Sequence, residues 1–372
     1  MVFDSDPSSV ATVNVPLGDR SYNIQIRTGA TDEFADCICD ALGDLSHIVV
    51  IADAAVRDQW AQPLTQSLCN RDNIRVDTLS VPSGEKSKSV SQLESLWNTL
   101  LDTGADRRSV VMAVGGGVIG DLAGFVAASF TRGIRFVQVP TTLLAMVDSS
   151  VGGKTGINLP GAKNMVGAFW QPSLVWIDTD VLSSLPDRSY ISGLAEVVKY
   201  GVIDDAEFFD FLESNAQRLV DRDNDAMRNA IARSCQSKAS VVGADERETS
   251  GRRAILNYGH TFAHAIEATA GYGSLLHGEA VSIGMQMAAR LAIELSMCDE
   301  ELLSRQTTLL QACRLPTTFP DADPEAMLPV MKRDKKVAHG KLRFILPSKI
   351  GAVELVGDVD EAAVVRAIEA SR

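Results

Sequence analysis

Three histidines gathered in one short stretch are the first chemical signal in this sequence. The chain has five histidines, and His260, His264 and His277 lie close together in "GHTFAHAIE" and "LLHGE". His260 and His264 stand four residues apart, so both can point to one side of a helix, as in helical zinc motifs. A buried core histidine is the usual alternative for one such residue. Three so close together indicate a metal site or an acid–base pair.

The residue types alone leave the metal ligands open. A catalytic zinc ion takes three protein ligands and keeps one position for water or substrate. The three histidines could supply them, or two of these histidines with a carboxylate such as Glu196. In "GLAEVVKYG", Glu196 and Lys199 stand three residues apart on one helix face. A surface ion pair is the ordinary interpretation, but the apolar residues around them favour a buried helix.

A segment of small residues and isolated cations precedes this region. Residues 141–172 carry Lys154, Lys163 and Asn164 among glycines, and Lys154 directly follows two of them. Glycine lets a backbone approach a ligand closely, so these side chains, with Arg132, could pair with phosphate or carboxylate groups. Lysines solvated on a surface loop are the alternative.

One further lysine falls on an apolar helix face. In "AMRNAIARSCQSKASVV", Lys238 shares a stripe with Met227, Ile231, Cys235 and Val242. Such a lysine either serves a buried site or extends its ammonium group to solvent along its apolar stem, and the pattern does not decide between the two.

A glycine loop indicates a nucleotide. "VVMAVGGGVIGDLAG" matches G-x-G-x-x-G through Gly115, Gly117 and Gly120, after a predicted strand and before a predicted helix. That context brings backbone amides to a pyrophosphate at a helix N-terminus. The acid expected about 20 residues further on is absent, and Asp53, at the end of an earlier strand, is the better candidate for the ribose hydroxyls. The pattern predicts a nucleotide bound by a variant Rossmann-like sheet.

The elements that must position these residues change character along the chain. Before residue 185, apolar runs alternate with helical patterns such as 89–104, which predicts a mostly parallel sheet. The predicted strands are 47–53, 73–81, 109–117, 133–142 and 173–180. Beyond it the periodicity is helical, except for a strand at 341–347. We predict a Rossmann-like α/β nucleotide-binding domain at 1–185 and a mostly α-helical domain at 186–372.

The composition narrows the function classes. The chain of 372 residues is 45% hydrophobic and 22% charged, as in globular proteins, and its net charge of -13 argues against a surface that coats nucleic acid. It shows no secretory signal and no apolar run of membrane-spanning length. Its six cysteines are scattered without a C-x-x-C pair. We therefore expect a cytoplasmic protein with reduced thiols that binds neither membranes nor nucleic acid.

Taken in order, these motifs resemble those of the 3-dehydroquinate synthases over about residues 47–356. The segments that carry the resemblance are "PSGEKSKS", "GGGVIGDLAGFVAASFTRGIRFVQVPTT", "VDSSVGGKTGINLPGAKNMVGAFWQP", "GLAEVVKYG", "RAILNYGHTFAHAIE", "HGEAVSIGM" and "DKKVAHGKLRFILP". The resemblance implies a lyase of the shikimate pathway, which leads to chorismate and the aromatic amino acids. Such an enzyme uses NAD and a divalent metal, zinc or cobalt. It converts 3-deoxy-D-arabino-heptulosonate 7-phosphate to 3-dehydroquinate and phosphate by transient oxidation, phosphate elimination, reduction, ring opening and intramolecular aldol closure.

The resemblance also implies a role for individual residues. The metal ligands would be Glu196, His260 and His277, which moves His264 to the phosphate. The phosphate binders would be Lys154, Asn164, Asn257, His264 and, from the neighbouring subunit of a homodimer, Arg132. The substrate carboxylate would meet Arg253 with Lys335 or Lys336, and the ring hydroxyls would meet Asp148, Lys199 and Lys238. The NAD contacts would be Asp53, Glu85, Lys88, Gly116, Gly117, Asp121, Thr141, Thr142, Lys163 and the neighbouring Lys154.

Two other functions stay open at this stage. Other sugar-phosphate cyclases, such as 2-epi-5-epi-valiolone and 2-deoxy-scyllo-inosose synthases, share the metal site but act on substrates without this carboxylate, so Arg253 and Asn257 favour the dehydroquinate reaction. A glycerol-dehydrogenase-like oxidoreductase would catalyse net hydride transfer. It would not need a phosphate pocket, so the many cations count against it.

Overall fold

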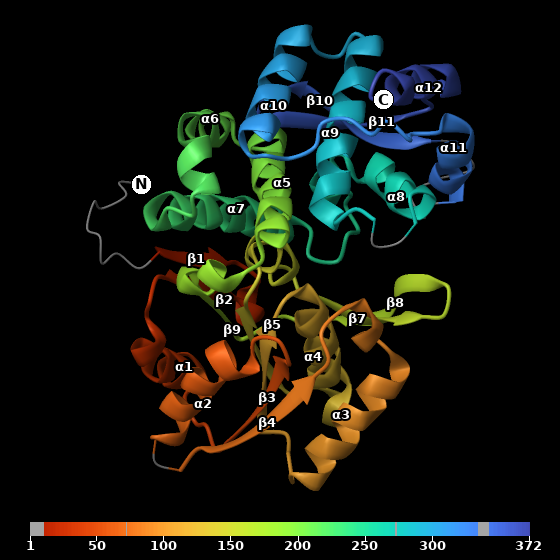
Figure 1. Cartoon of the computed structure of the whole chain (residues 1–372). Coiled ribbons are helices and arrows are strands. Elements are labelled where there is room, and N and C mark those ends of the chain that lie inside the picture. Colours follow the sequence, from red (N-terminus) through yellow and green to blue (C-terminus); the bar gives the residue numbers. More distant parts are fainter. Residues whose placement is uncertain (1–10, 72, 272–273, 334–341) are drawn as a thin grey trace. The chain divides into compact units, whose positions relative to one another are not determined.

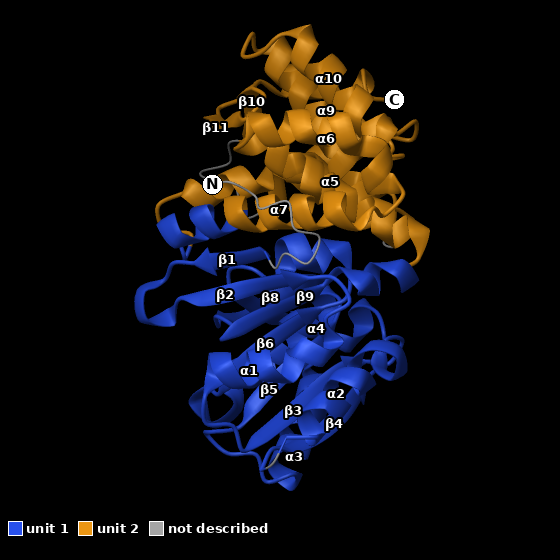
Figure 2. Cartoon of the chain, turned by 90° about the vertical axis from the view of Figure 1, so that its left-hand side faces the viewer, with its two compact units in different colours: residues 1–185, 238–247 blue, residues 186–237, 248–372 orange. Residues whose placement is uncertain are grey.

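The computed structural model describes residues 11–71, 73–271, 274–333 and 342–372. The chain forms two compact units (Figure 2). Unit 1 comprises residues 1–185 and 238–247, and unit 2 comprises 186–237 and 248–372. The first unit thus ends near the predicted boundary, but residues 238–247 return to it. They do so because Lys238 bonds to Asp148 and Gly243 packs against Pro16, all in unit 1.

Unit 1 is built on a seven-stranded sheet in the order β1-β2-β9-β6-β5-β3-β4. Every neighbouring pair is parallel except β1 and β2. The strands are β1 (Ala11–Val15), β2 (Tyr22–Arg27), β3 (His47–Asp53), β4 (Arg75–Val81), β5 (Val110–Gly115), β6 (Arg135–Pro140) and β9 (Leu174–Asp178). The predicted α/β class with a mostly parallel sheet is confirmed. The sequence patterns missed β1, β2 and a hairpin of β7 (Lys154–Leu159) and β8 (Ala162–Phe169).

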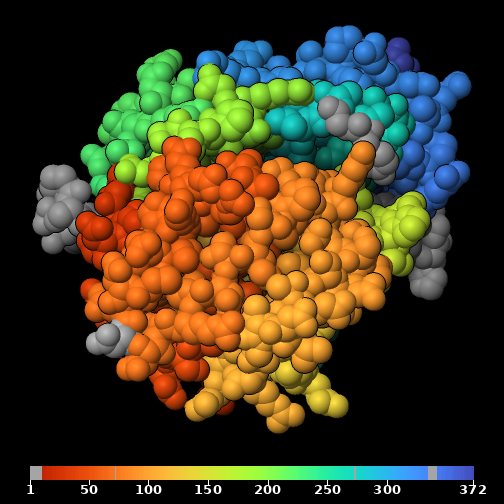
Figure 3. All heavy atoms as spheres, turned by 60° about the horizontal axis from the view of Figure 1, so that its bottom comes forward, coloured from red at the N-terminus to blue at the C-terminus, as the bar shows by residue number. Residues whose placement is uncertain are grey.

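The central strands β3, β5, β6 and β9 of this sheet are buried on both faces, which explains their continuous apolar runs. The flanking helices are α1 (Phe34–Leu42), α2 (Gln62–Cys69), α3 (Val90–Asp102) and α4 (Gly117–Ser129). In β3, Ile48 and Val50 pack in one core with residues of α1 and α2, while Val49 and Ile51 pack in the other with residues of α3 and α4. In Figure 3 orange residues, which include α2 and α3, cover much of the face of unit 1 turned toward the viewer.

Unit 2 is mostly helical, as predicted, with one antiparallel strand pair (Figure 1). Its elements are α5 (Asp187–Ile203), α6 (Ala206–Val220), most of α7 (Asn224–Ala244), α8 (His260–Thr269), α9 (His277–Glu294), α10 (Glu300–Ala312), α11 (Pro324–Arg333), α12 (Glu361–Glu369), β10 (Arg343–Lys349) and β11 (Ala352–Gly357). The buried helix α9 contacts α5, α8, α10, α12 and β10. Helix α5 is buried on every side from Tyr190 to Ile203, so any polar residue within it lies inside the unit. None of the helices in the described part of the chain has the length and apolar character that a membrane span requires.

Candidate active site

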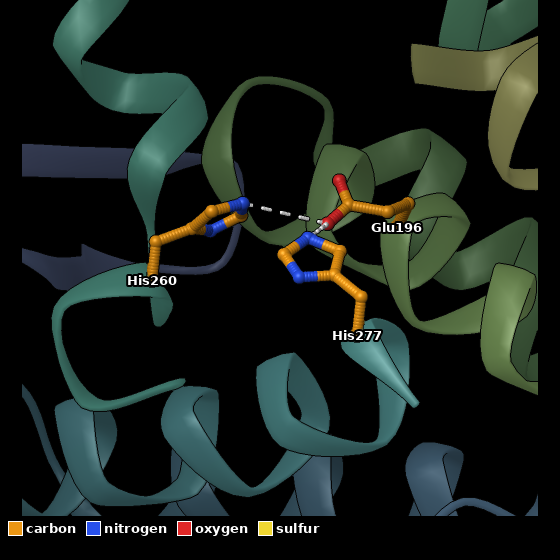
Figure 4. Close-up of side chains that lie close together, drawn as sticks. All are labelled: Glu196, His260 and His277. Atoms are coloured by element: carbon orange, nitrogen blue, oxygen red, sulfur yellow. Dashed lines mark ion pairs between the residues drawn. The ribbon is translucent and has the colours of Figure 1, made fainter. Parts of the chain in front are cut away.

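One carboxylate and two imidazoles converge in unit 2 from three different helices. Glu196 lies in the middle of α5, while His260 and His277 are the first residues of α8 and α9. Each offers one ligand atom within 4.8 Å of the others. Figure 4 shows both rings turned toward the carboxylate, whose Oε1 lies 3.7 Å from Nε2 of His260 and 3.8 Å from Nε2 of His277.

The distances among these three side chains suit a shared divalent metal ion better than hydrogen bonds between the side chains. Glu196 is completely buried, and its Oε1 accepts no hydrogen bond from any described residue. The separations of 3.7 and 3.8 Å are too long for hydrogen bonds. They are close to the roughly 3.3–3.6 Å between ligand atoms that each bind a zinc ion at about 2.0–2.2 Å. A buried carboxylate oxygen that faces two imidazole nitrogens across such a gap is a suitable ligand set for zinc or cobalt.

Hydrogen bonds fix the tautomer of both imidazoles. Nδ1 of His260 donates to the carbonyl oxygen of Tyr258 at 3.0 Å, and Nδ1 of His277 donates to Oε1 of Glu267 at 3.0 Å. Since Nδ1 carries the proton in each neutral ring, Nε2 keeps its lone pair for a metal. Both Nε2 atoms face Glu196, so the three side chains present one donor set to a common point.

Glycines let the three helices approach closely enough to form the cluster. A Cβ atom on Gly278 would lie 1.8 Å from the carbonyl oxygen of Ser192, so only glycine lets the first turn of α9 contact α5 there. A Cβ atom on Gly284 would lie 2.2 Å from the carbonyl oxygen of Gly259, just before α8, and Gly259 itself has φ +77. Glycine thus permits the backbone contacts that place His277 beside Glu196 and His260 beside α9.

The Glu196–Lys199 pair is buried, so the surface interpretation of this motif is wrong. Lys199 is 1% exposed, and its ammonium group forms an ion pair with Oε2 of Glu196. A buried carboxylate is costly unless it is paired. Lys199 balances the charge of Oε2, while Oε1 faces the two imidazoles.

In unit 1, Lys88 connects residues that the family resemblance assigns to NAD and to the substrate phosphate. The buried Nζ of Lys88 donates to Oδ2 of Asp121 at 2.7 Å and to Oδ1 of Asn164, and lies 3.9 Å from Oε1 of Glu85. Asn158 completes this network, because its amide donates to Glu85 and its Oδ1 accepts from the backbone N–H of Asn164. Burial raises the pKa of Asp121 above its ordinary value, and the Lys88 ammonium opposes that rise.

The glycine loop lies at the carboxyl edge of the sheet, where ligands of open α/β sheets bind. β5 ends at Gly115 and α4 begins at Gly117. Asp53 ends the adjacent strand β3, and its Oδ1 accepts hydrogen bonds from Ser83 and from the N–H of Ala55. Thr142 lies against Gly116, where a Cβ atom would come within 3.1 Å of its methyl carbon. The predicted strand–loop–helix context is therefore present.

A second lysine pair in unit 1 joins the end of α7 to the segment that follows β6. Nζ of Lys238 donates to the carbonyl oxygen of Asp148 at 2.6 Å and also forms an ion pair with its carboxylate. Lys238 is buried, so its ammonium does not extend to solvent along the apolar stem.

Comparison with known proteins identifies the family. Two family models match consecutive parts of the chain, one described as 3-dehydroquinate synthase N-terminal over residues 78–192 and one as 3-dehydroquinate synthase C-terminal over residues 193–337. A curated 3-dehydroquinate synthase from Rhodopirellula baltica is 64% identical over 368 residues, 98% of each chain. The chain belongs to the 3-dehydroquinate synthase family.

Solved structures of related cyclases share this architecture. A 2-deoxy-scyllo-inosose synthase complexed with carbaglucose-6-phosphate, NAD⁺ and Co²⁺ is 28% identical with a TM-score of 0.88, and the match covers 97% of this chain and 100% of that one. A 2-epi-5-epi-valiolone synthase from Streptomyces hygroscopicus subsp. jinggangensis 5008, with NAD⁺ and Zn²⁺ bound, is 29% identical with a TM-score of 0.85, and the match covers 94% and 96% of the two chains. Both are sugar-phosphate cyclases, the first of the two alternatives that the sequence left open.

The remaining residues that the 3-dehydroquinate synthase motifs single out take different positions. The ring of His264 lies beside that of His260, with centroids 5.8 Å apart, outside the set of three candidate ligands. Arg253 is buried, with its Nε 3.7 Å from Oε1 of Glu248. Asn257 ends the same short helical segment, Arg252–Asn257. The two candidates of the "DKK" motif, Lys335 and Lys336, lie outside the described residues.

Three candidate cations are surface residues of unit 1. Lys154, at the start of β7, Lys163, in β8, and Arg132 are exposed. Thr131 and Arg132 both have positive φ, 48 and 72, a backbone conformation that non-glycine residues seldom adopt.

The motif-based prediction missed Glu267. This residue stands seven positions after His260 in "HTFAHAIE", hence on the same face of α8. The spacing could have placed Glu267 on the face of α8 that carries His260. It could not show that Glu267 accepts a hydrogen bond from His277, because His277 begins a different helix.

Proposed function

We propose that this chain is a 3-dehydroquinate synthase that converts 3-deoxy-D-arabino-heptulosonate 7-phosphate to 3-dehydroquinate and phosphate. The observation that carries the proposal is the convergence of Glu196, His260 and His277 in a chain of this family. The curated relative with 64% identity bears the same name. The reaction is that of a carbon–oxygen lyase acting on a phosphate ester.

Glu196, His260 and His277 would hold a divalent ion, zinc or cobalt, and unit 1 would hold NAD. When bound, the ion would polarise substrate oxygens and lower the pKa of a hydroxyl, while the nicotinamide would accept and return one hydride. The solved structures of two related cyclases hold NAD⁺ with Zn²⁺ or Co²⁺. The lone pairs fixed on both Nε2 atoms and the bare carboxylate oxygen support the metal assignment.

The nucleotide contacts belong to the carboxyl edge of the unit 1 sheet. The amides of Gly116 and Gly117 at the start of α4 would face the pyrophosphate, and Asp53 would accept hydrogen bonds from the ribose. The other contacts in this assignment are Glu85, Lys88, Asp121, Thr141, Thr142, Lys154 and Lys163. The Lys88 network holds two carboxylates of this set in place.

The remaining polar and cationic residues would bind the phosphate and carboxylate groups of the substrate. Lys154, Asn164, Asn257 and His264, with Arg132 of the partner subunit in a homodimer, would bind the phosphate. Arg253, with Lys335 or Lys336, would bind the carboxylate, which favours this substrate over the substrates of other cyclases. Asp148, Lys199 and Lys238 would orient the ring hydroxyls and carry protons to and from them. We expect the enzyme to be cytoplasmic.

The decisive experiment is an assay of the purified protein with NAD, zinc and the heptulosonate phosphate. We expect stoichiometric release of phosphate without accumulation of NADH, because the cofactor is reoxidised in each cycle. Glucose 6-phosphate, which has no carboxylate, serves as the comparison substrate, and we expect no phosphate release from it. Steady production of NADH would instead establish a dehydrogenase. Faster turnover of glucose 6-phosphate would establish a different cyclase.

A further inference from the structure

The imidazole of His277 is held by a side chain that none of the family motifs assigns to the site. We infer that Glu267 is a positioning residue that orients His277 for the metal, an inference that rests on the proposed metal site. Its Oε1 accepts a hydrogen bond from Nδ1 of His277 at 3.0 Å. Glu267 does not belong to the cluster of candidate ligands, so it acts through the histidine.

Helix α8 controls both imidazoles. His260, His264 and Glu267 stand at positions i, i+4 and i+7, which lie on one face of the helix. The first of them is itself a candidate ligand, and the last binds the candidate ligand on α9. Helix α8 therefore supplies one candidate ligand and the hydrogen bond that orients the imidazole of the other.

His277 needs this support more than the other two candidate ligands. Its side chain is 33% exposed, against 12% for His260 and 0% for Glu196. Packing alone therefore holds its ring less firmly. His260 is oriented by a backbone carbonyl, that of Tyr258, which a side-chain substitution does not remove. Glu267 is thus the point at which the orientation of one imidazole can be changed selectively.

The backbone of His277 is fixed by a separate group of contacts. Arg188 pairs with Glu279 through Nε and Nη2, at 2.7 and 2.8 Å, and its Nη2 also donates to the carbonyl oxygen of Ser274 at 2.8 Å. Glu279 in turn accepts from the N–H of Leu276 at 2.7 Å and caps α9. None of these contacts involves the Glu267 carboxylate, so its removal leaves them in place at the start of α9 while the ring of His277 loses its hydrogen bond.

The experiment compares metal affinity in Glu267→Ala, Glu267→Gln and wild type. Loss of a hydrogen-bonded partner behind a metal-binding histidine costs about 10–100-fold in affinity, and we expect this loss in Glu267→Ala. The glutamine amide oxygen still accepts from Nδ1, so Glu267→Gln should remain within about fivefold of wild type. Zinc affinity is measured by competition with a chromophoric chelator, and the visible spectrum of the Co²⁺ protein reports the ligand geometry. Both readouts are independent of turnover.

The matched control is Glu294→Ala, which removes a carboxylate of α9 that pairs with Arg366 at the surface. It should bind zinc like wild type, and the metal-free forms of all variants should melt within a few degrees of one another. A Glu267→Ala protein with wild-type zinc affinity and cobalt spectrum would overturn the inference, as would an equal loss in the control. If the wild-type protein itself binds no zinc, the proposed metal site fails, and that failure is visible before any variant is compared.

Discussion

The two units hold their candidate functional residues by different physical means. In unit 2 the three candidate ligands lie on three helices, and the backbones of those helices touch at Gly278 and Gly284. In unit 1 the candidates lie on loops after strands, on the β7–β8 hairpin, and on the helices α4 and α7. Hydrogen bonds from the buried ammonium groups of Lys88 and Lys238 tie them together.

This difference predicts how each region responds to change. A site fixed by backbone contacts is already arranged for its ligand, but any atom added at the contact must displace a whole helix. A site fixed by long side chains loses its arrangement when one lysine is removed, while the sheet beneath it stays intact. A single substitution should therefore cause a large loss of metal binding at the Glu196–His260–His277 cluster of unit 2. It should cause a smaller loss of ligand binding at the Lys88 and Lys238 contacts of unit 1.

The largest expected effect comes from a direct change to the helical site. In His277→Ala one of three candidate ligands is lost, so we expect bound metal to disappear and turnover to fall by more than about 1000-fold. The side chain is 33% exposed, so the stability of the metal-free protein should change by less than about 0.5 kcal/mol. Metal analysis after dialysis, activity and chemical denaturation check these three points.

His264→Ala is the matched control, because His264 is adjacent to the cluster but lies outside it. We expect it to retain one equivalent of zinc while it loses phosphate binding. If His264→Ala releases the metal and His277→Ala keeps it, the pair at i,i+4 holds the ion and the assignment to Glu196, His260 and His277 is wrong.

A smaller effect is expected when only the helix contact is changed. In Gly278→Ala the new methyl group would lie 1.8 Å from the carbonyl oxygen of Ser192, so α9 must move away from α5. Such overpacking costs about 1–3 kcal/mol, and zinc affinity should fall with it because His277 is the adjacent residue. Gly357→Ala, where the nearest atom is 3.9 Å away, should leave both unfolding and zinc binding unchanged.

The sequence predicted the fold of unit 1 where burial dominates. The run 47–53 is apolar because β3 is covered on both faces, so its strand could be predicted at its true bounds. Strands β1 and β2 were missed because buried and more exposed residues alternate along them, so neither forms a continuous apolar run like that of β3. The β7–β8 hairpin was not predicted, because most of β8 is exposed and the segment showed only small residues with isolated cations.

The candidate site was predictable in its residue types but not in its geometry. Spacing brought out His260 and His264 as a pair, yet the structure joins His260 to His277 and Glu196. That choice depends on the approach of α5 and α9 at Gly278, a contact between segments far apart in the chain. Only the family motifs, which carry this information indirectly, singled out the three side chains that the structure brings together.

The smallest expected effect comes from the loop network of unit 1. In Lys88→Met the contacts to Asp121, Asn164 and Glu85 are lost, while the apolar stem is kept. We expect NAD affinity to fall about tenfold, near 1.4 kcal/mol, with zinc content unchanged, as measured by calorimetric titration and metal analysis. Lys86→Met, in the same turn but exposed, should bind NAD like wild type. Loss of zinc in Lys88→Met would show that the two regions do not respond independently.

The stability lost in Lys88→Met should also depend on pH, which a defect of packing alone would not produce. Burial already raises the pKa of Asp121 above 3.8, and Lys88 opposes that rise, so the pKa of Asp121 should rise further in Lys88→Met. A carboxyl group with a raised pKa in the folded state binds more protons there than in the unfolded state, so stability falls as the pH increases from about 4. Lys88→Met should therefore lose more stability relative to wild type at pH 7 than at pH 4 in urea denaturation. An equal loss at both values would mean that Lys88 contributes by packing and not by its charge.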